Sequence, residues 1–483
     1  MTQSTPFLRT RAAGTALAAA VLAGCSFIPN YERPVAPLPT SYPGAVPADA
    51  QGARAAADIR WQDYFTDPQL QALIGLALQN NRDQRVAMLR VEQARAQFDI
   101  QRSAELPTVN AMGTFTRQPN PANGNKYGSV YQAGLAVTGW EIDFFGRIAA
   151  LKEQALAQYL ATDEARKAGQ ISLVAAVASG WLALVADEEL MDLSRRTLQT
   201  REESVKLTRL RLDHGVSSEL DLRQAESLAE QARATLAQQE RQRMLDENAL
   251  ALLVGQAIPD ELLTRPGHRR LAGTAPMQPL PAGLPSELLQ HRPDIMAAEQ
   301  QLIGANASIG AARAAFFPRI ALTAQFGSTS TELSGLFKGG SWAFSLAPQA
   351  VLPIFDAGRN QANLRAAQVG REIAVAQYEK SIQTAFREVA DALAGRATLQ
   401  DQLDAQMAQT RSDTRRFELS DLRYRNGVAS YLDLLDAQRS LFASEQALVL
   451  TRLQQLQNQV VLYKVLGGGW SAGEDTTAAT GRG

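Results

Sequence analysis

The sequence of 483 residues is poor in the side chains that build compact catalytic and metal sites. It has one cysteine and three scattered histidines (His214, His268 and His291), which excludes disulfides within the chain and Cys/His zinc sites. The 48 Lys and Arg residues balance 49 Asp and Glu residues, so a basic nucleic-acid-binding surface is not expected. No Ser/His/Asp cluster, P-loop or metal-ligand spacing occurs. We therefore expect no enzyme activity, no bound metal and no bound cofactor.

Long hydrophobic runs are also missing. The longest lies at the N-terminus and is too short to span a bilayer, so we expect no transmembrane helix. In this segment Arg9 and Arg11 precede an apolar stretch at 12–20, and Leu-Ala-Gly-Cys25 follows. This order predicts a secretory signal over residues 1–24 that is removed from the mature chain. The alternative is an ordinary buried cysteine in a signal region.

Proline is absent from two long stretches, residues 122–258 and residue 354 to the end. Ala, Leu, Gln, Glu and Arg dominate both stretches, and all of these are strong helix formers. We predict one helix over residues 147–213 and another over 359–426. At about 1.5 Å per residue each would be roughly 100 Å long.

The chain contains two copies of one unit. The segment from Leu207 to Leu222 matches the segment from Leu419 to Leu434, and Gly146-Arg147 matches Gly358-Arg359 at the same displacement. Each copy is predicted to hold a first helix (about 82–105 and 293–315), two short β segments and two long helices. The long helices break at Gly-Val turns, where a glycine can end one helix and a serine can cap the next.

The β segments alternate between an apolar face and a polar or small face, which is typical of outer-membrane strands. Pro348 predicts a bulge or a strand end. The loops at 118–130 and 328–341 are rich in glycine, asparagine and serine. A soluble sheet with one packed face is the alternative. The segments are 109–117, 131–138, 319–326 and 342–347.

Four strands cannot close a membrane barrel by themselves. Only helices and closed barrels cross a bilayer, because unpaired backbone groups in lipid cost several kcal/mol each. The smallest known barrels have about eight strands. If these strands span a membrane, several protomers must share one barrel. Two would give a barrel too narrow for a water channel, so three is the more economical number.

Several motifs together resemble the TolC-like outer membrane factors, in particular the NodT-type efflux outer-membrane lipoproteins. The resemblance covers nearly the whole chain, from Cys25 to Trp470. The most specific segments are Arg292-Pro-Asp-Ile295, Ile309-Gly-Ala-Ala-Arg313, Phe316-Phe-Pro318, Tyr424-Arg-Asn-Gly-Val428, Leu434-Leu-Asp-Ala-Gln-Arg439 and Leu462-Tyr-Lys-Val-Leu-Gly-Gly-Gly-Trp470.

This resemblance implies an α+β membrane protein with two tandem repeats. Its trimeric 12-stranded outer-membrane β-barrel, with four strands from each protomer, would continue into a long α-helical barrel. The implied function is the exit duct of a tripartite efflux pump, part of the RND-type antibiotic-resistance systems. The implied partners are two further copies, a periplasmic adaptor and an inner-membrane RND-type transporter. A lipid-anchored periplasmic scaffold or adaptor is the alternative function.

The resemblance also implies a lipid anchor. Cys25 would become the first residue of the mature chain and carry an N-acyl (palmitate) group and an S-diacylglycerol group. Ser26 follows, where an aspartate would mark retention in the inner membrane in many Gram-negative bacteria. The protein would thus be anchored in the outer membrane and extend into the periplasm.

Three residues form a candidate gate. Leu432, Asp436 and Arg439 are spaced i, i+4 and i+7, so they share one face of a helix. Three copies of Asp436 around a threefold axis would form an acidic ring, and such rings favour cations. In the resembled family the matching leucine and aspartate constrict the closed periplasmic aperture. The alternative is that Asp436 and Arg439 form an ordinary surface pair.

The two Gly-Val turns form candidate docking sites for the adaptor, as the resemblance implies. A plain solvated turn is the alternative. The tip residues are Gly215, Val216, Ser217 and Ser218 in the first copy and Gly427, Val428, Ala429 and Ser430 in the second.

The sequence predicts six segments. Its eight methionines form no cluster, so copper or silver export has no positive support, and the cargo is not readable. The segments are a signal peptide (1–24), a lipidated proline-rich arm (25–60), a first repeat (61–255), an equatorial linker (256–285), a second repeat (286–466) and a flexible tail (467–483).

Overall fold

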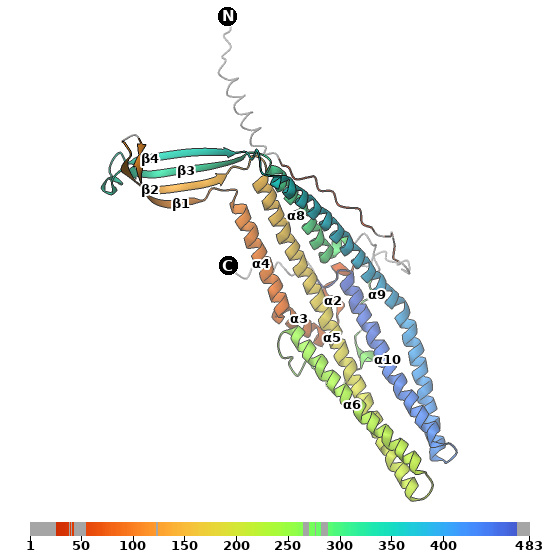
Figure 1. The fold of residues 1–483 in the computed structure, drawn as a ribbon. Helices are drawn as coiled ribbons and strands as arrows, with labels where there is room; N and C mark the ends of the chain where they lie inside the picture. The colour runs from red at the N-terminus through yellow and green to blue at the C-terminus, as the bar shows by residue number, and fades with distance from the viewer. Residues whose placement is uncertain are drawn as a thin grey trace. The chain divides into compact units, whose positions relative to one another are not determined.

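The computed structural model describes residues 26–37, 39, 41–42, 55–121, 124–263, 270–275, 277–281 and 288–470 (Figure 1). The predicted signal peptide and Cys25 lie outside these residues, as does most of the predicted tail. The chain divides into two compact units. The first takes residues 1–35, 90–163 and 297–379, and the second takes 36–89, 164–296 and 380–483.

The first unit holds a four-stranded antiparallel sheet in the order β1-β2-β3-β4. Its strands are β1 (Val109–Asn120), β2 (Lys126–Glu141), β3 (Arg319–Ser330) and β4 (Trp342–Val351). All four predicted strands are present, but they are longer than the apolar alternation indicated. Because the ladder is made by backbone groups, pairing continues into the polar residues that the sequence had assigned to loops.

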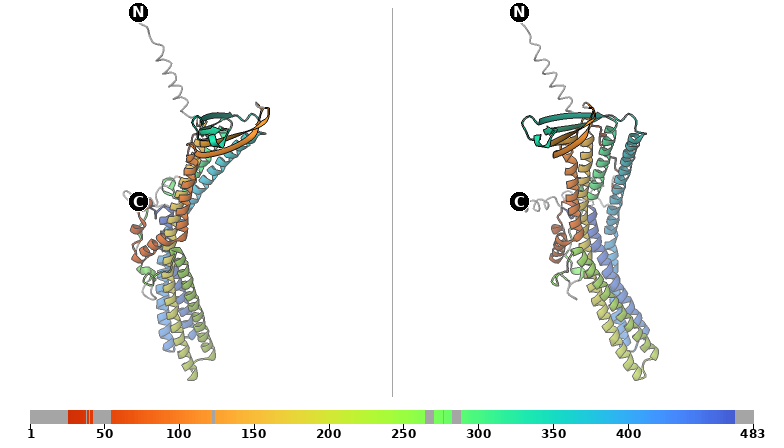
Figure 2. Two further views of the ribbon diagram at one scale, coloured as in Figure 1. Left: turned by 90° about the vertical axis from the view of Figure 1, so that its left-hand side faces the viewer. Right: turned by 60° about the vertical axis from the view of Figure 1, so that its left-hand side comes forward.

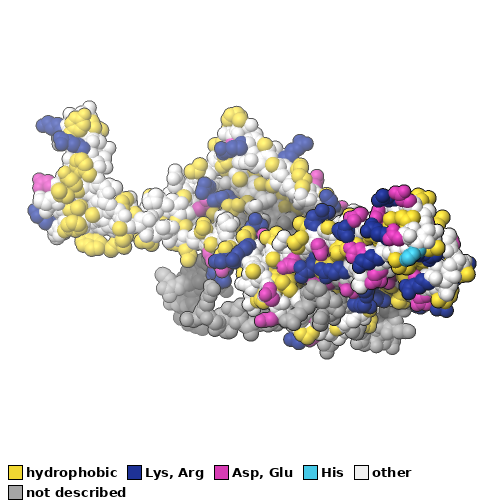
Figure 3. Space-filling view, turned by 90° about the horizontal axis from the view of Figure 1, so that it is seen from below, with side chains coloured by type: hydrophobic (Ala, Val, Ile, Leu, Met, Phe, Trp, Pro, Cys, Tyr) yellow, Lys and Arg dark blue, Asp and Glu magenta, His cyan; other side chains and the backbone are white. Residues whose placement is uncertain are grey.

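One face of the sheet is apolar and exposed. Leu135 lies opposite Phe326, which in turn lies opposite Phe344, so the three side chains form a row across β2, β3 and β4. Their exposed fractions are 51%, 51% and 69%. In the view of Figure 3, charged side chains gather at the outer end of the strands. An isolated chain therefore leaves a large hydrophobic surface without a covering layer.

The bulge in the sheet is at Gly139 and not at Pro348. The β2–β3 register shifts between Val137 and Trp140, where Gly139 has a φ of 65°. Pro348 stays within β4, paired with Leu322, so the prediction of a bulge or strand end there was wrong. An edge strand tolerates proline because one side of its backbone has no ladder partner in the sheet.

The predicted helices are confirmed nearly to the residue. The first helix of each copy is α4 (Arg82–Ser103) or α8 (Pro293–Ala314). The long helices α5 and α9 have 67 residues each, and both begin in the first unit and end in the second. The returning helices run beside them (Figures 1 and 2). The bounds are α5 (Arg147–Asp213), α6 (Glu219–Val254), α9 (Arg359–Arg425) and α10 (Tyr431–Val465).

The sequence indicated no transmembrane helix, but α5 passes a test for one. It is long enough to cross a membrane and contains an 18-residue window that is apolar enough, by composition alone. However, 61% of that window is buried inside the protein, and Val177 and Trp181 are completely buried. Burial of this extent is what a core helix shows, so we assign this part of α5 to the core of the second unit.

Short helices before α4 were not predicted. They are η1 (Ala56–Asp58), α2 (Trp61–Tyr64) and α3 (Pro68–Asn80), and the remaining short ones are η3 (Leu271–Gly273), α7 (Leu288–His291) and η5 (Leu333–Gly335). The Tyr64 ring stacks on the Tyr463 ring with centroids 4.0 Å apart. The Tyr463 hydroxyl donates a buried hydrogen bond to the Ile59 carbonyl at 2.5 Å. This contact ties the N-terminal helices to the end of α10.

The Arg292-Pro-Asp motif has a structural explanation. The Arg292 side chain is 9% exposed and donates to Asp294 at 2.6 Å and to Glu388 at 2.8 Å. It also donates to the Val465 carbonyl at 3.1 Å. A buried guanidinium needs such partners, because an uncompensated buried charge is strongly destabilising. The motif thus joins the start of α8 to α9 and to the end of α10.

We predict that Gly134→Val separates β2 from β3. A Cβ atom on Gly134 would lie 2.3 Å from the Phe326 carbonyl oxygen, and no flexible side chain is there to yield. The measurement is the fraction of membrane-inserted protein that migrates as a folded, heat-modifiable band. Gly113→Val in β1 is the control, because a Cβ there would meet no atom within 4 Å. Equal folded fractions for the two variants would contradict the prediction.

Candidate functional site at the hairpin tips

Both hairpin tips are closed by the same backbone motif. At the first, Gly215 has a φ of 73°, its N–H donates to the Leu212 carbonyl at 2.8 Å, and the Val216 N–H donates to the Arg211 carbonyl at 2.9 Å. These two bonds define a Schellman motif. Gly427 has a φ of 74° and its neighbours repeat the pattern. The prediction that these glycines end the long helices is confirmed.

Serines cap the returning helices. Ser218 and Asp221 form a capping box at α6, with backbone-to-side-chain bonds of 3.2 and 3.1 Å, and Ser430 and Asp433 do the same at α10. Burial acts to raise the pKa of Asp221, but the hydrogen bonds from Ser218 outweigh it and hold that pKa below its usual range.

Each tip also presents an exposed valine. Val216 is 63% exposed and Val428 is 65% exposed. The capping motifs fix the backbone around them. The tips are therefore ordered turns with one apolar side chain available for contact.

The candidate gate residues share one face of α10, as predicted. Leu432 is 61% exposed, and Asp436 and Arg439 are also exposed. Leu434 and Leu435 point to the opposite side and are buried. The face that carries the gate residues is thus unpacked within a single chain.

The partner of Asp436 is Arg416 of α9, which the sequence reasoning missed. The Arg416 guanidinium contacts the Asp436 carboxylate and also donates to the Ser440 hydroxyl at 3.3 Å. Among the described residues Arg439 forms no ion pair, so the alternative of an Asp436–Arg439 surface pair is wrong. A signal existed, because Arg416 and Asp436 lie at similar distances along the chain from Gly427. Residues so placed in an antiparallel hairpin face each other.

A small aromatic core joins the two hairpins close to the gate residues. The Tyr424 and Tyr431 rings are 5.5 Å apart, and they pack with Ala225 and Leu228 of the first hairpin. The guanidinium of Arg211 lies over the Tyr424 ring at 4.7 Å. Burial raises the pKa of the Tyr431 hydroxyl to about 12. The start of α10 therefore depends on packing against α6.

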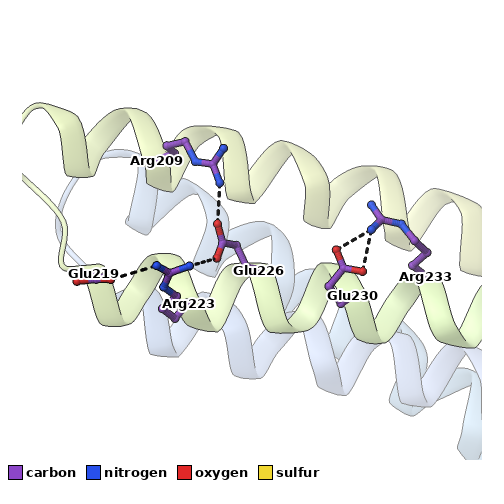
Figure 4. Close-up of polar contacts among 6 residues, drawn as sticks. All are labelled: Arg209, Glu219, Arg223, Glu226, Glu230 and Arg233. Atoms are coloured by element: carbon purple, nitrogen blue, oxygen red, sulfur yellow. Dashed lines mark hydrogen bonds and ion pairs between the residues drawn. The ribbon is translucent and has the colours of Figure 1, made fainter.

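Exposed ion pairs line the first hairpin (Figure 4). Glu226 accepts from Arg209 at 2.6 Å and from Arg223 at 3.0 Å, and Arg233 donates to Glu230 at 2.6 Å. Water and salt screen pairs this exposed, so each contributes little to stability. The Arg209–Glu226 pair joins α5 to α6, whereas the other two lie within α6.

The N-terminal arm is fastened to α8 within the first unit. The Phe27 ring stacks on Phe317 at 4.6 Å, and the Asn306 amide donates to the Pro29 carbonyl at 2.7 Å. Ile28 lies against Gly310, where a Cβ atom would come within 2.6 Å of it. Phe317 lies just before β3, which begins at Arg319. The residues that follow Cys25 are therefore held beside the start of a strand.

A buried carboxylate holds the arm further along. The Glu299 side chain is 9% exposed and accepts two bonds from Arg33, at 2.7 and 2.9 Å, and one from the Tyr31 hydroxyl at 3.0 Å. Burial raises the pKa of Tyr31, and the hydrogen bond to Glu299 raises it further. Two hydrogen bonds from one arginine to the two oxygens of a carboxylate also fix the relative orientation of the two side chains.

Comparison with known proteins decides the family. A family model described as outer membrane efflux protein matches residues 73–256 and again residues 284–468, once for each repeat. The chain belongs to the outer membrane efflux protein family. It is therefore an outer-membrane channel component of an efflux pump, and the family is not enzymatic.

Individual relatives agree over nearly their whole length. The chain is 47% identical to the solvent efflux pump outer membrane protein SrpC of Pseudomonas putida, covering 94% of this chain and 97% of the relative. It is 45% identical to OprJ of Pseudomonas aeruginosa, covering 96% and 97%. The open state of the Neisseria gonorrhoeae MtrE outer membrane channel superposes with a TM-score of 0.84 at 41% identity, covering 92% and 98%. The predicted TolC-like fold is thus confirmed.

These comparisons leave the roles of individual residues as predictions. The described residues contain no group of three His, Cys, Asp or Glu side chains that could hold a metal ion. The gate residues and the two tips are brought into the second unit, and Cys25 lies outside the described residues.

We predict that Ser430→Ala loosens the first turn of α10. The substitution removes the acceptor for the Asp433 N–H, and loss of an N-cap costs about 1 kcal/mol. Amide hydrogen exchange at Asp433 should become about fivefold faster. Ser412→Ala is the control, because that hydroxyl only bonds the Ala408 carbonyl within α9. Unchanged exchange at Asp433 in Ser430→Ala would show that the cap does not hold the turn.

Proposed function

We propose that three copies of this chain form a passive exit duct across the outer membrane. The observation that carries the proposal is the open four-stranded sheet with an exposed apolar face. Its edge strands β1 and β4 have no second partner in the sheet. In lipid such edges would leave backbone groups unsatisfied, and closing them between protomers removes that cost. Twelve strands give a barrel wide enough for water.

The names of the relatives support a proposal for the cargo and the partners. SrpC is named for solvent efflux, and a second relative with 47% identity is named for toluene efflux. We propose that this duct conducts small toxic compounds of the solvent and antibiotic classes. The energy would come from an inner-membrane RND-type transporter. A periplasmic adaptor would contact the hairpin tips, where Val216 and Val428 are exposed and the backbone is fixed.

A lipid on Cys25 would anchor the duct in the inner leaflet of the outer membrane. Support comes from the arm, because Phe27 is stacked on Phe317 beside the start of β3. The arm leaves only Ser26 between this contact and Cys25. An acyl chain on Cys25 would thus enter the bilayer next to the strand. The predicted division of the chain, with a signal peptide over 1–24, is part of this proposal.

The gate would be a ring of α10 residues at the periplasmic end. Asp436 carries the acidic charge, Leu432 supplies an apolar constriction, and Arg439 lies one turn further on. Arg416 extends the predicted set, because it holds the Asp436 carboxylate. In this arrangement opening requires α10 to move away from its neighbours.

The repeat predicts how the edges of neighbouring protomers pair. Val109 pairs with Val137 in the first copy, and Ile320 pairs with Ala350 in the second. Matching the apolar faces of the strands superposes these two pairs, because β1 and β3 are then displaced by 320 − 109 = 211 residues and β2 and β4 by 350 − 137 = 213. Both copies therefore present equivalent strands. The observed β2–β3 register can accordingly be transferred to β4 of one protomer and β1 of the next.

We predict that the double variant Gln118→Cys with Ser345→Cys forms disulfide-linked trimers. The observed Gln132–Thr329 pair maps onto Ser345 of one protomer opposite Gln118 of the next. Oxidised membranes should yield a covalent trimer on a denaturing gel. Gln118→Cys with Ala347→Cys is the control, because a shift of two residues places the Cα atoms too far apart for a disulfide. Protein that stays monomeric in lipid and carries no ion current would overturn the duct.

We predict that Asp436→Ala and Arg416→Met each raise passive leak through the duct. Either change removes the contact between Arg416 of α9 and Asp436 near the start of α10. The measurements are single-channel conductance in lipid bilayers and antibiotic uptake by cells that lack the pump. Arg415→Met is the matched control, since Arg415 pairs with Glu418 on the same helix. Wild-type leak in both variants would remove these residues from the gate.

A further inference from the structure

A cavity in the second unit lies between α5, α9 and α10. It is open to solvent and has a volume of about 150 Å³. Four apolar side chains and two buried polar ones contribute to its wall: Leu193, Phe417, Leu441, Phe442, Arg201 and Gln438. Two aromatic rings in the wall of a cavity suit a flat apolar molecule.

Arg201 is a buried cation without a carboxylate partner among the described residues. It is 5% exposed, and no described residue offers a hydrogen-bond acceptor to its Nε atom. Within the part of the chain that the structure describes, its one hydrogen bond runs from Nη1 to the Leu228 carbonyl at 3.3 Å, and the Phe442 ring lies 5.8 Å from the guanidinium. Burial lowers the pKa of Arg201, and the charge of Arg439 lowers it further. By contrast, the equally buried Arg292 has two carboxylate partners.

Gln438 also lines the cavity and holds a second unsatisfied polar atom. Among the described residues, its buried Oε1 atom has no hydrogen-bond donor. Water in the cavity would leave the positive charge of Arg201 unneutralised. An occupant that carries an anionic group would compensate the charge of the guanidinium.

Arg196 and Glu445 also line the cavity. Burial raises the pKa of the Glu445 carboxyl, which favours its neutral form, while Arg196 and Arg270 act to lower that pKa. The buried Arg201 thus lacks one negative charge, and a monoanion with an apolar body supplies that charge and fills the apolar part of the cavity.

We propose that this cavity is a binding site for aromatic monocarboxylates. The carboxylate pairs with the Arg201 guanidinium, and the ring packs between Phe417 and Phe442. Gln438 lies between Asp436 and Arg439 in the sequence, so an occupant contacts α10 within the segment that carries the gate residues. The site does not depend on the proposed trimer or cargo, because all of its walls come from one chain.

The probe is 2-naphthoate, with the neutral isostere 2-naphthamide and inorganic phosphate as comparisons. Full-length protein in lipid nanodiscs is titrated by calorimetry, and empty nanodiscs correct for partitioning into lipid. We expect saturable binding of 2-naphthoate that is at least about tenfold tighter than that of the amide, because a charge-assisted hydrogen bond is lost. Weaker binding of phosphate than of 2-naphthoate is also expected.

Arg201→Met tests the proposed contact. We expect it to weaken 2-naphthoate binding at least about tenfold and to leave the thermal midpoint of the ligand-free protein equal or higher, because an uncompensated buried charge is removed. Arg195→Met is the control, since Arg195 is an exposed residue of α5 that pairs with Glu240. Equal affinities for the acid and the amide, unchanged binding by Arg201→Met, or no saturable binding at millimolar 2-naphthoate would each overturn the proposal.

Discussion

The pairing of backbone hydrogen bonds along β1 and β4 is the constraint on which the rest of this structure depends. Both are edge strands of the sheet within one chain, and in a bilayer neither can turn to water for its missing partner. The chain therefore needs other copies before it can cross the membrane. Assembly in turn creates the hollow interior, which a single four-stranded sheet cannot enclose.

The long helices were readable from the sequence because their ends are set by local chemistry. Proline is absent from residues 122–258 and from residue 354 to the end, and Gly215 and Gly427 adopt the left-handed conformation that ends each helix. The strands were harder to bound, because their outer ends carry polar residues whose pairing is set by the backbone. The bulge at Gly139 rather than at Pro348 has the same origin, since only the register of two strands shows where a residue is left over.

The candidate functional site was also predictable only in part. The candidate gate residues of α10 follow helical spacing, so their common face was predictable. The contact between Arg416 and Asp436 joins two helices and depends on how they are rotated about their axes, which spacing along one helix does not reveal. Arg201 gives no signal at all, because it looks like any other arginine of a charged helix. Only burial distinguishes it from Arg195 and Arg196.

The equal size of the two copies limits how this protein can change over evolutionary time. Helices α5 and α9 have 67 residues each, and their tips are joined through the packing of Ala225 and Leu228 against Tyr424 and Tyr431. Two extra helical turns in one hairpin alone would carry these partners past each other. A lineage could lengthen the protein only through matched insertions in both halves, so gene duplication fixed the dimensions as well as the fold.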